Sequence, residues 1–200
     1  MQEIAACAAR MVVEEGFEYG AAKRRALKTL GLPQRSALPS NERVEEHVYE
    51  YIELFCSETQ PQELAALRAH ALQWMDRLQA FRPHLGGAVW RGTATRLSDI
   101  YLQLFCDDSK SAEIALINMN LTYDVTTVKG FHGGAVDALS LHSFCPQLGE
   151  DIGVHLLIYD HDDLRGALKP DAQGRTARGD ANALKKIIES RYDHKDAQRN

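Results

Sequence analysis

The stretch RGTATRLSDIYL, residues 91–102, decides how the second half of this chain folds. From Asp99 onward, apolar residues stand at every second position, which is typical of a β-strand with one covered face. The covered face would consist of Ile100, Leu102, Leu104 and Cys106. The opposite face would carry Asp99, Tyr101, Gln103 and Phe105. Because alternate residues of a strand point to the same side, we expect Asp99 and Tyr101 to lie side by side, facing any cleft there.

The composition narrows the class of protein. The chain has 200 residues, of which 44% are hydrophobic and 26% charged, as in globular proteins of one or two domains. No window approaches the roughly 20 apolar residues of a membrane span, and the N-terminal stretch is amphipathic and acidic, unlike a signal peptide. We therefore expect a cytoplasmic protein without a membrane partner. The net charge of −5 argues against a mainly electrostatic nucleic-acid binder.

The cysteines give no sign of a metal or redox site. Cys7, Cys56, Cys106 and Cys145 are far apart in the sequence and lack the CxxC pairs of zinc sites and redox centres. We expect them to be reduced and mostly buried thiols.

The spacing of apolar residues changes near Phe81 and divides the chain. Residues 1–82 have the three- and four-residue spacing of helices. The predicted helices span residues 2–15 and 20–30, a third contains Val44 to Phe55, and a fourth begins near Pro61. Residues 169–200 read as a mobile loop, a short helix that Asp180 caps, and a polar tail.

Residues 83–168 read as an α/β core. Strands are predicted near residues 88–90, 99–106, 121–128, 138–144 and 154–159, with a helix over 111–119. The whole chain is thus predicted to be an α+β protein, in which an N-terminal helical region packs on a mixed sheet with flanking helices.

The residues around the opening stretch follow a known pattern: Gly86 and Gly87, then Arg91 and Gly92, then Ser98, Asp99 and Ile100. In this register residues 85–128 resemble the nucleotidyltransferase superfamily, whose fold is shared by DNA polymerase β and the small bacterial nucleotidyltransferases. That family carries a Gly-Ser turn, commonly Arg-Gly, then Asp-x-Asp on a strand and a third carboxylate on a later strand. The resemblance implies a nucleotidyltransferase-like sheet.

The chemistry behind that pattern assigns roles to these residues. Exposed N–H groups beside glycine let the backbone approach a triphosphate. Carboxylates at positions i and i+2 of a strand can hold two Mg²⁺ ions, which neutralise the phosphates and activate the attacking oxygen. The resemblance implies that Asp99 is a metal ligand and catalytic residue. The ligand-binding residues that it implies are Gly86, Gly87, Arg91, Gly92, Ser98 and Tyr101.

Two departures from the pattern weaken the case for catalysis. Ala88 stands at the family's serine and removes a phosphate-binding hydroxyl. Tyr101 stands at the second carboxylate, and a neutral phenol with a pKa of about 10 cannot replace a carboxylate as a ligand of a hard dication. The sequence therefore favours a degenerate member of the family.

The third carboxylate should lie on a neighbouring strand. Asp124 is the better candidate, because Thr122, Asp124 and Thr126 alternate with apolar residues. Asp137 is the runner-up. For either residue the alternative is a solvated carboxylate at a strand end.

Three functions are compatible with these observations. The favoured one is binding of a ligand such as a nucleotide, or of a partner, without two-metal catalysis. The alternative is an enzyme, a Mg²⁺-dependent nucleotidyltransferase with Asp99 and Asp124 as catalytic metal ligands. The third is an interaction protein working through its N-terminal helices, where the basic run of residues 23–28 could meet phosphates or simply be a solvated face.

Overall fold

The computed structural model describes the backbone of residues 1–171 and 174–197 and the side chains of residues 1–171 and 174–190. The chain forms two compact units. The helical unit comprises Met1–Leu64 and Thr93–Ser98, and the sheet unit comprises Ala65–Gly92 and Asp99–Asn200. The division therefore falls at residue 64, in place of the predicted 82, and the middle of the opening stretch belongs to the helical unit.

The helical unit is built on three helices: α1 (Gln2–Glu15), α2 (Tyr19–Thr29) and α3 (Asn41–Phe55). The predicted bounds of α1 are confirmed, and those of α2 are one residue too late at each end. Gly16 ends α1 in the left-handed conformation, with φ 71°, which glycine adopts without a steric cost. The Ser40 side chain accepts a hydrogen bond from the Arg43 N–H and caps α3.

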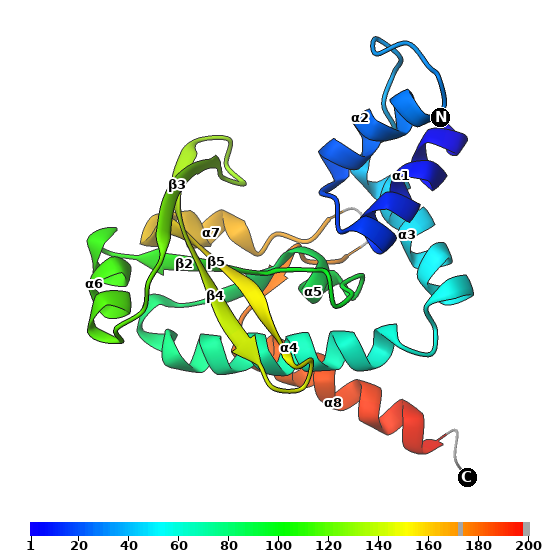
Figure 1. The fold of residues 1–200 in the computed structure, drawn as a ribbon. Helices are drawn as coiled ribbons and strands as arrows, with labels where there is room; N and C mark the ends of the chain where they lie inside the picture. The colour runs from blue at the N-terminus through cyan, green and yellow to red at the C-terminus, as the bar shows by residue number, and fades with distance from the viewer. Residues whose placement is uncertain (172–173, 198–200) are drawn as a thin grey trace. The chain divides into compact units, whose positions relative to one another are not determined.

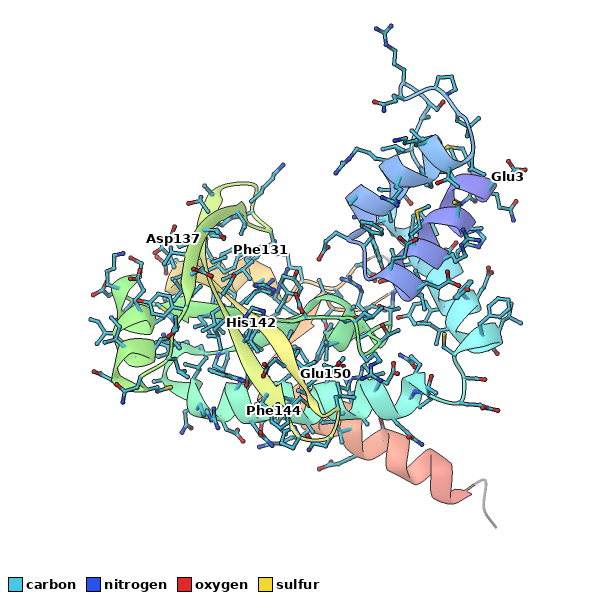
Figure 2. All side chains as sticks on the ribbon, in the orientation of Figure 1. Glu3, Phe131, Asp137, His142, Phe144 and Glu150 are labelled. Carbon is cyan, nitrogen blue, oxygen red and sulfur yellow. The ribbon has the colours of Figure 1, made fainter. Side chains whose placement is uncertain are left out.

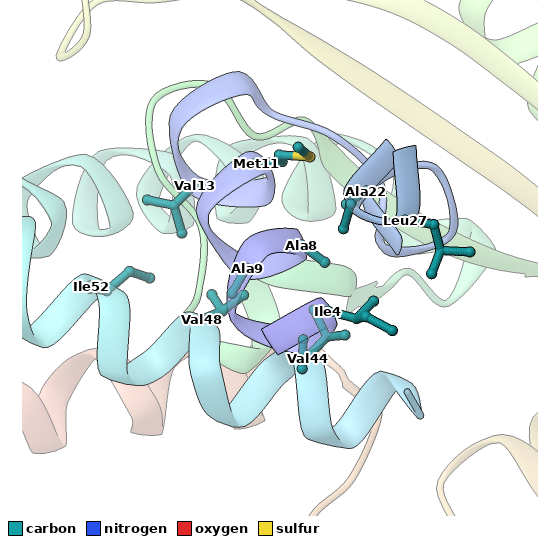
Figure 3. Packing of buried hydrophobic residues seen from close by; sticks show 12 residues of the cluster. Ile4, Ala8, Ala9, Met11, Val13, Ala22, Leu27, Val44, Val48 and Ile52 are labelled. Carbon is teal, nitrogen blue, oxygen red and sulfur yellow. The ribbon is translucent and has the colours of Figure 1, made fainter. Parts of the chain in front are cut away.

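The apolar faces of these helices form one core, shown in Figure 3. The members labelled there are Ile4, Ala8, Ala9, Met11, Val13, Ala22, Leu27, Val44, Val48 and Ile52. Burying each larger aliphatic side chain contributes about 1.5–3 kcal/mol. Residues 93–98 join this unit through polar contacts: the Gln60 side chain donates to the Ala94 carbonyl over 2.7 Å, and the Arg96 N–H donates to the Glu63 carboxylate over 2.9 Å.

The described residues of the sheet unit form a six-stranded mixed sheet with the order β3-β4-β5-β2-β1-β6 (Figure 1). The strands are β1 (His84–Gly86), β2 (Ile100–Cys106), β3 (Asp124–Lys129), β4 (Ala135–Cys145), β5 (Glu150–Asp160) and β6 (Arg178–Gly179). Strand β2 is parallel to β5, and all other neighbours are antiparallel. The α+β class with a mixed sheet is thus confirmed.

One face of this sheet, the core face, is apolar. Register places Leu139, Leu156, Leu102 and Leu85 in one row across β4, β5, β2 and β1. Helix α4 (Gln60–Arg77) packs on this face, since the side chains of Trp74 and His70 both hydrogen-bond to Ser143 on β4. We call the opposite side the Tyr101 face, after the residue of β2 that points to it.

Short elements complete the sheet unit. Helix α6 (Lys110–Asn118) follows β2, near its predicted place. The segment η2 (His161–Asp163) and α7 (Leu164–Ala167) follow β5, and Ala167 packs with Phe105, Val136 and Tyr159 at one end of the Tyr101 face. Asp180 caps α8 (Ala181–Ala197) by accepting from the Ala183 N–H, as expected. The η1 turn (Gln79–Phe81) follows α4.

One strand prediction was wrong, and the strand predicted over residues 121–128 begins three residues later, as β3. Residues 88–90 are helical, in α5 (Gly87–Arg91), because Gly87 with φ 66° turns the chain out of β1. A short apolar run does not distinguish a buried strand from a buried helical turn. Residues 121–123 precede β3, because the Leu121 N–H returns to the Leu116 carbonyl and closes the end of α6.

The C-terminal segment also differs from its prediction. Arg178 and Gly179, placed in a mobile loop, pair with β1 as β6. Residues 172–173 of that loop and 198–200 of the polar tail lie outside the described residues. Among the described helices, none is sufficiently long and apolar to cross a membrane.

Candidate functional site

The candidate site lies on the Tyr101 face, where a row of directly opposed residues crosses the sheet. From β3 to β6 the row consists of Asp124, Ser140, His155, Tyr101, Gly86 and Arg178. Directly opposed residues of neighbouring strands share a face. Asp99 stands immediately before β2, and its carboxylate lies over Gly153 of β5.

Asp99, His155 and Ser140 are joined by two hydrogen bonds. His155 Nε2 lies 2.9 Å from Asp99 Oδ2, and His155 Nδ1 lies 2.8 Å from Ser140 Oγ. Because an ionised carboxylate can only accept, Nε2 carries a proton, and in the neutral form of the ring Nδ1 accepts from the Ser140 hydroxyl. We call this chain of contacts the Asp99–His155–Ser140 relay.

The surroundings of Asp99 favour its charged form. The hydrogen bond from His155 lowers the pKa of Asp99 below its ordinary value, and the Gly153 N–H adds to this, while partial burial opposes it. A Cβ on Gly153 would lie 2.6 Å from the Asp99 carboxylate, so only glycine leaves this carboxylate its place. The Asp99 and His155 side chains remain 45% and 25% exposed, within reach of solvent and ligands.

Tyr101 fills the space beside the relay. Its ring stacks on the His155 ring with 4.7 Å between centroids and 25° between planes. On its other flank, a Cβ built on Gly87 would lie 3.5 Å from Tyr101 Cδ2. The phenol is therefore held between the Gly86–Gly87 turn and the imidazole of His155.

The structure brings together only some of the residues assigned from the sequence. Gly86 and Gly87 lie next to Tyr101. Arg91 is the exposed last residue of α5, and the N–H of Gly92 donates to the Ala88 carbonyl, which removes it as a donor to a phosphate. Ser98 belongs to the helical unit, where its hydroxyl accepts from the Thr95 N–H over 3.0 Å.

Neither candidate third carboxylate lies beside Asp99. Asp124 is exposed on the edge strand β3 and shares the Tyr101 face, but β4 and β5 separate it from β2. At the usual strand spacing this is about 14 Å between backbones, too far for two ligands of one ion. Asp137 alternates with Ala138 and points to the core face.

The residues around Asp99 do not fit a pair of Mg²⁺ ions. Mg²⁺ prefers oxygen ligands in near-octahedral geometry, whereas Asp99 is hydrogen-bonded to the imidazole of His155 on β5, and that ring is stacked on the phenol of Tyr101 on β2. In the described part of the chain, no three or more His, Cys, Asp or Glu side chains are grouped so that they could hold a metal ion.

Three residues of this face were not found from the sequence. His155 and Ser140 occupy the polar positions of alternating strands, a signal that was present, but their partnership depends on the pairing of β2 with β5 and of β5 with β4. Arg178, opposite Gly86, lay in a segment without periodicity. Its guanidinium donates to the Ala167 carbonyl and lies 4.3 Å from the ring centroid of Phe131, a residue labelled in Figure 2.

Comparison of the chain with protein-family models, with curated proteins and with solved structures found no match. The resemblance to nucleotidyltransferases therefore remains a prediction from residues 85–128.

Proposed function

We propose that this protein is a degenerate nucleotidyltransferase-like protein that binds a ligand, such as a nucleotide, on the Tyr101 face without two-metal catalysis. The observation that carries the proposal is the stack of Tyr101 on His155, with His155 also hydrogen-bonded to Asp99. Tyr101 stands where the nucleotidyltransferase pattern has its second carboxylate. The residue directly opposite it on the parallel strand β5 is His155.

Arg178 supports an anionic ligand. It stands opposite Gly86, and burial lowers the pKa of its guanidinium. Among the described side chains, no carboxylate forms an ion pair with it, and its Nε lacks an acceptor. A partly desolvated cation without a counter-ion is stabilised by a bound anion, and a nucleotide phosphate would supply one.

One observation favours the enzyme alternative, a Mg²⁺-dependent nucleotidyltransferase. The carboxylate of Asp99 stays ionised and is 45% exposed, so it can still meet a cation.

The third alternative, an interaction protein acting through the helical unit, has less support. Within that unit Lys23 donates to the Asn41 side chain and Arg25 stacks on Phe17, so two of its basic groups are already engaged. The four thiols are free, in keeping with the cytoplasmic location that we propose.

A thermal-shift screen of nucleotides with and without Mg²⁺ tests the proposal. A ligand at 100 times its dissociation constant stabilises the folded protein by about 2.7 kcal/mol. We expect a nucleotide to raise the melting temperature without Mg²⁺. This rise should be lost in Arg178→Gln and should persist in the control Arg165→Gln, whose side chain is exposed on α7.

The other outcomes separate the alternatives. A shift that needs Mg²⁺ and vanishes in Asp99→Ala, together with transfer of labelled nucleotide, would favour the enzyme. If no nucleotide changes the melting temperature, both the nucleotide-binding proposal and the nucleotidyltransferase alternative are contradicted. The interaction protein is then the remaining alternative.

A further inference from the structure

We propose that Ser140 is a nucleophile that His155 activates, and that it accepts an acyl group from an activated carboxylic ester on the Tyr101 face. This activity does not need Arg178, which is proposed above to meet a nucleotide phosphate, but it shares Tyr101, His155 and Asp99 with the proposed nucleotide site.

The relay has the connections of a serine nucleophile, a base and a carboxylate that orients the base. In the neutral form of the ring the Ser140 hydroxyl donates to His155 Nδ1 over 2.8 Å, and His155 Nε2 donates to Asp99 over 2.9 Å. Both distances lie within the range required of a nucleophile–base pair and of a base and its orienting group. Compared with the serine proteases, the two ring nitrogens exchange roles, since here Nδ1 is the base.

The sheet holds these groups in place. Ser140 and His155 are directly opposed on the antiparallel strands β4 and β5, so their separation is fixed by the ladder. The Tyr101 ring fixes the plane of the imidazole by stacking on it. Nucleophiles depend on such preorganisation, and the half-buried Ser140 remains reachable from solvent.

The charges around Ser140 select the class of substrate. Asp124 is exposed and directly opposite Ser140 on β3, and Asp99 is ionised at the far end of the relay. Beside Ser140 these two carboxylates repel an anionic phosphoester, whereas the carbonyl of a carboxylic ester is neutral. The nucleotide phosphate proposed above would lie at Arg178 on β6, which β5, β2 and β1 separate from Ser140. His142, labelled in Figure 2, is exposed two residues along β4 on the same face, where its N–H can donate to the oxyanion that forms.

The reaction balances without a co-reactant other than water. The Ser140 oxygen forms a bond to the carbonyl carbon and its proton passes to His155 Nδ1. The ester C–O bond then breaks, and the leaving alkoxide takes that proton. Water releases the acyl group in the same way, with His155 as the base.

Acetylation of the full-length chain by p-nitrophenyl acetate tests the proposal, with release of p-nitrophenolate and mass spectrometry of peptides as the two readouts. We expect a burst of p-nitrophenolate and a single acetyl group on Ser140. Both should be lost in Ser140→Ala, whereas Ser140→Cys should retain an acylated side chain at this position. The control Ser109→Ala removes an exposed serine before α6 and should react like the wild type.

The contribution of the base is read from His155→Gln, in which the burst rate should fall by about 100-fold or more. Circular dichroism of each variant shows whether it folds. If His155→Gln does not fold, the test depends on Ser140→Ala, which removes a single oxygen. The proposal is overturned if Ser140→Ala is acetylated as fast as the wild type, if urea-unfolded wild type reacts as fast as the folded chain, or if a folded His155→Gln keeps the full rate.

Discussion

His155 lies directly opposite Tyr101 in the parallel pair of β2 and β5, and the two rings stack with 4.7 Å between their centroids. This contact, together with the hydrogen bond from His155 to Asp99, gives the Tyr101 face its chemical character. A surface that would need clustered carboxylates to hold Mg²⁺ carries an imidazole and a phenol. The imidazole and the phenol make this face suited to binding a ligand and to transferring protons.

Replacing Tyr101 by aspartate tests whether this phenol blocks metal binding. Tyr101→Asp places carboxylates at positions 99 and 101, on one face of β2, and we expect a Mg²⁺- or Mn²⁺-dependent thermal stabilisation that the wild type lacks. Tyr101→Asn is the matched control, because it has the same size without the charge. A wild type that is already stabilised by Mg²⁺ as strongly as Tyr101→Asp would show that Tyr101 is no obstacle.

The lowered pKa of Asp99 predicts a pH dependence of stability. The carboxyl group binds its proton more weakly in the folded chain than its ordinary pKa of 3.8 would give, chiefly because of the hydrogen bond from His155. Its contribution to the free energy of unfolding is therefore fully present above that pH and is lost as the pH falls through the lower, folded value.

Urea unfolding of the wild type and of Asp99→Asn measures this contribution. The difference between their free energies of unfolding should be larger at about pH 6 than at about pH 2.5. Asp151→Asn, an exposed carboxylate on β5, is the control and should show a smaller pH-dependent difference. Equal pH dependence of the two variants would contradict the role of His155.

Ser143→Ala should destabilise the packing of α4 on the sheet. The Ser143 hydroxyl is the partner of both Trp74 Nε1, at 3.0 Å, and His70 Nε2, at 2.9 Å. Trp74 and His70 are both buried, so removing the hydroxyl leaves polar groups without a partner at a cost of about 1–3 kcal/mol. Denaturant unfolding measures the loss, and Ser109→Ala is the control. A change equal to that of the control would mean that other groups satisfy these side chains.

The strong periodic patterns predicted much of this fold. Alternation placed Asp99 and Tyr101 opposite the core residues Ile100 and Leu102, and register confirms that Leu102 lies in the core row. Alternation assigns a residue to a face, but it does not say which strands are neighbours. Asp124 was on the predicted face, yet two strands separate it from β2, while His155 lies directly beside Tyr101.

The remaining predictions failed where the structure depends on a single backbone turn or on contacts between residues far apart in the sequence. The apolar run at residues 88–90 is compatible with a strand, but these residues form part of α5, because the chain turns at Gly87. The pairing of Arg178 with β1 depends on contacts between residues some 90 positions apart, which no local pattern records. The residues that define the relay became neighbours for the same reason, through strand order alone.

Gly179→Ala should be strongly destabilising, because β6 leaves no room for a side chain there. A Cβ on Gly179 would lie 2.1 Å from Cη2 of Trp90, whose ring is buried and whose Nε1 donates to the Thr176 carbonyl over 2.8 Å. The large indole cannot yield cheaply, so we expect a loss of about 1–3 kcal/mol or more. Gly166→Ala in α7 is the matched control. No atom lies within 4 Å of the added carbon there, and alanine favours a helix by up to about 1 kcal/mol. Urea unfolding should therefore rank Gly179→Ala far below Gly166→Ala, and similar stabilities would mean that Trp90 does not pack against β6 in solution.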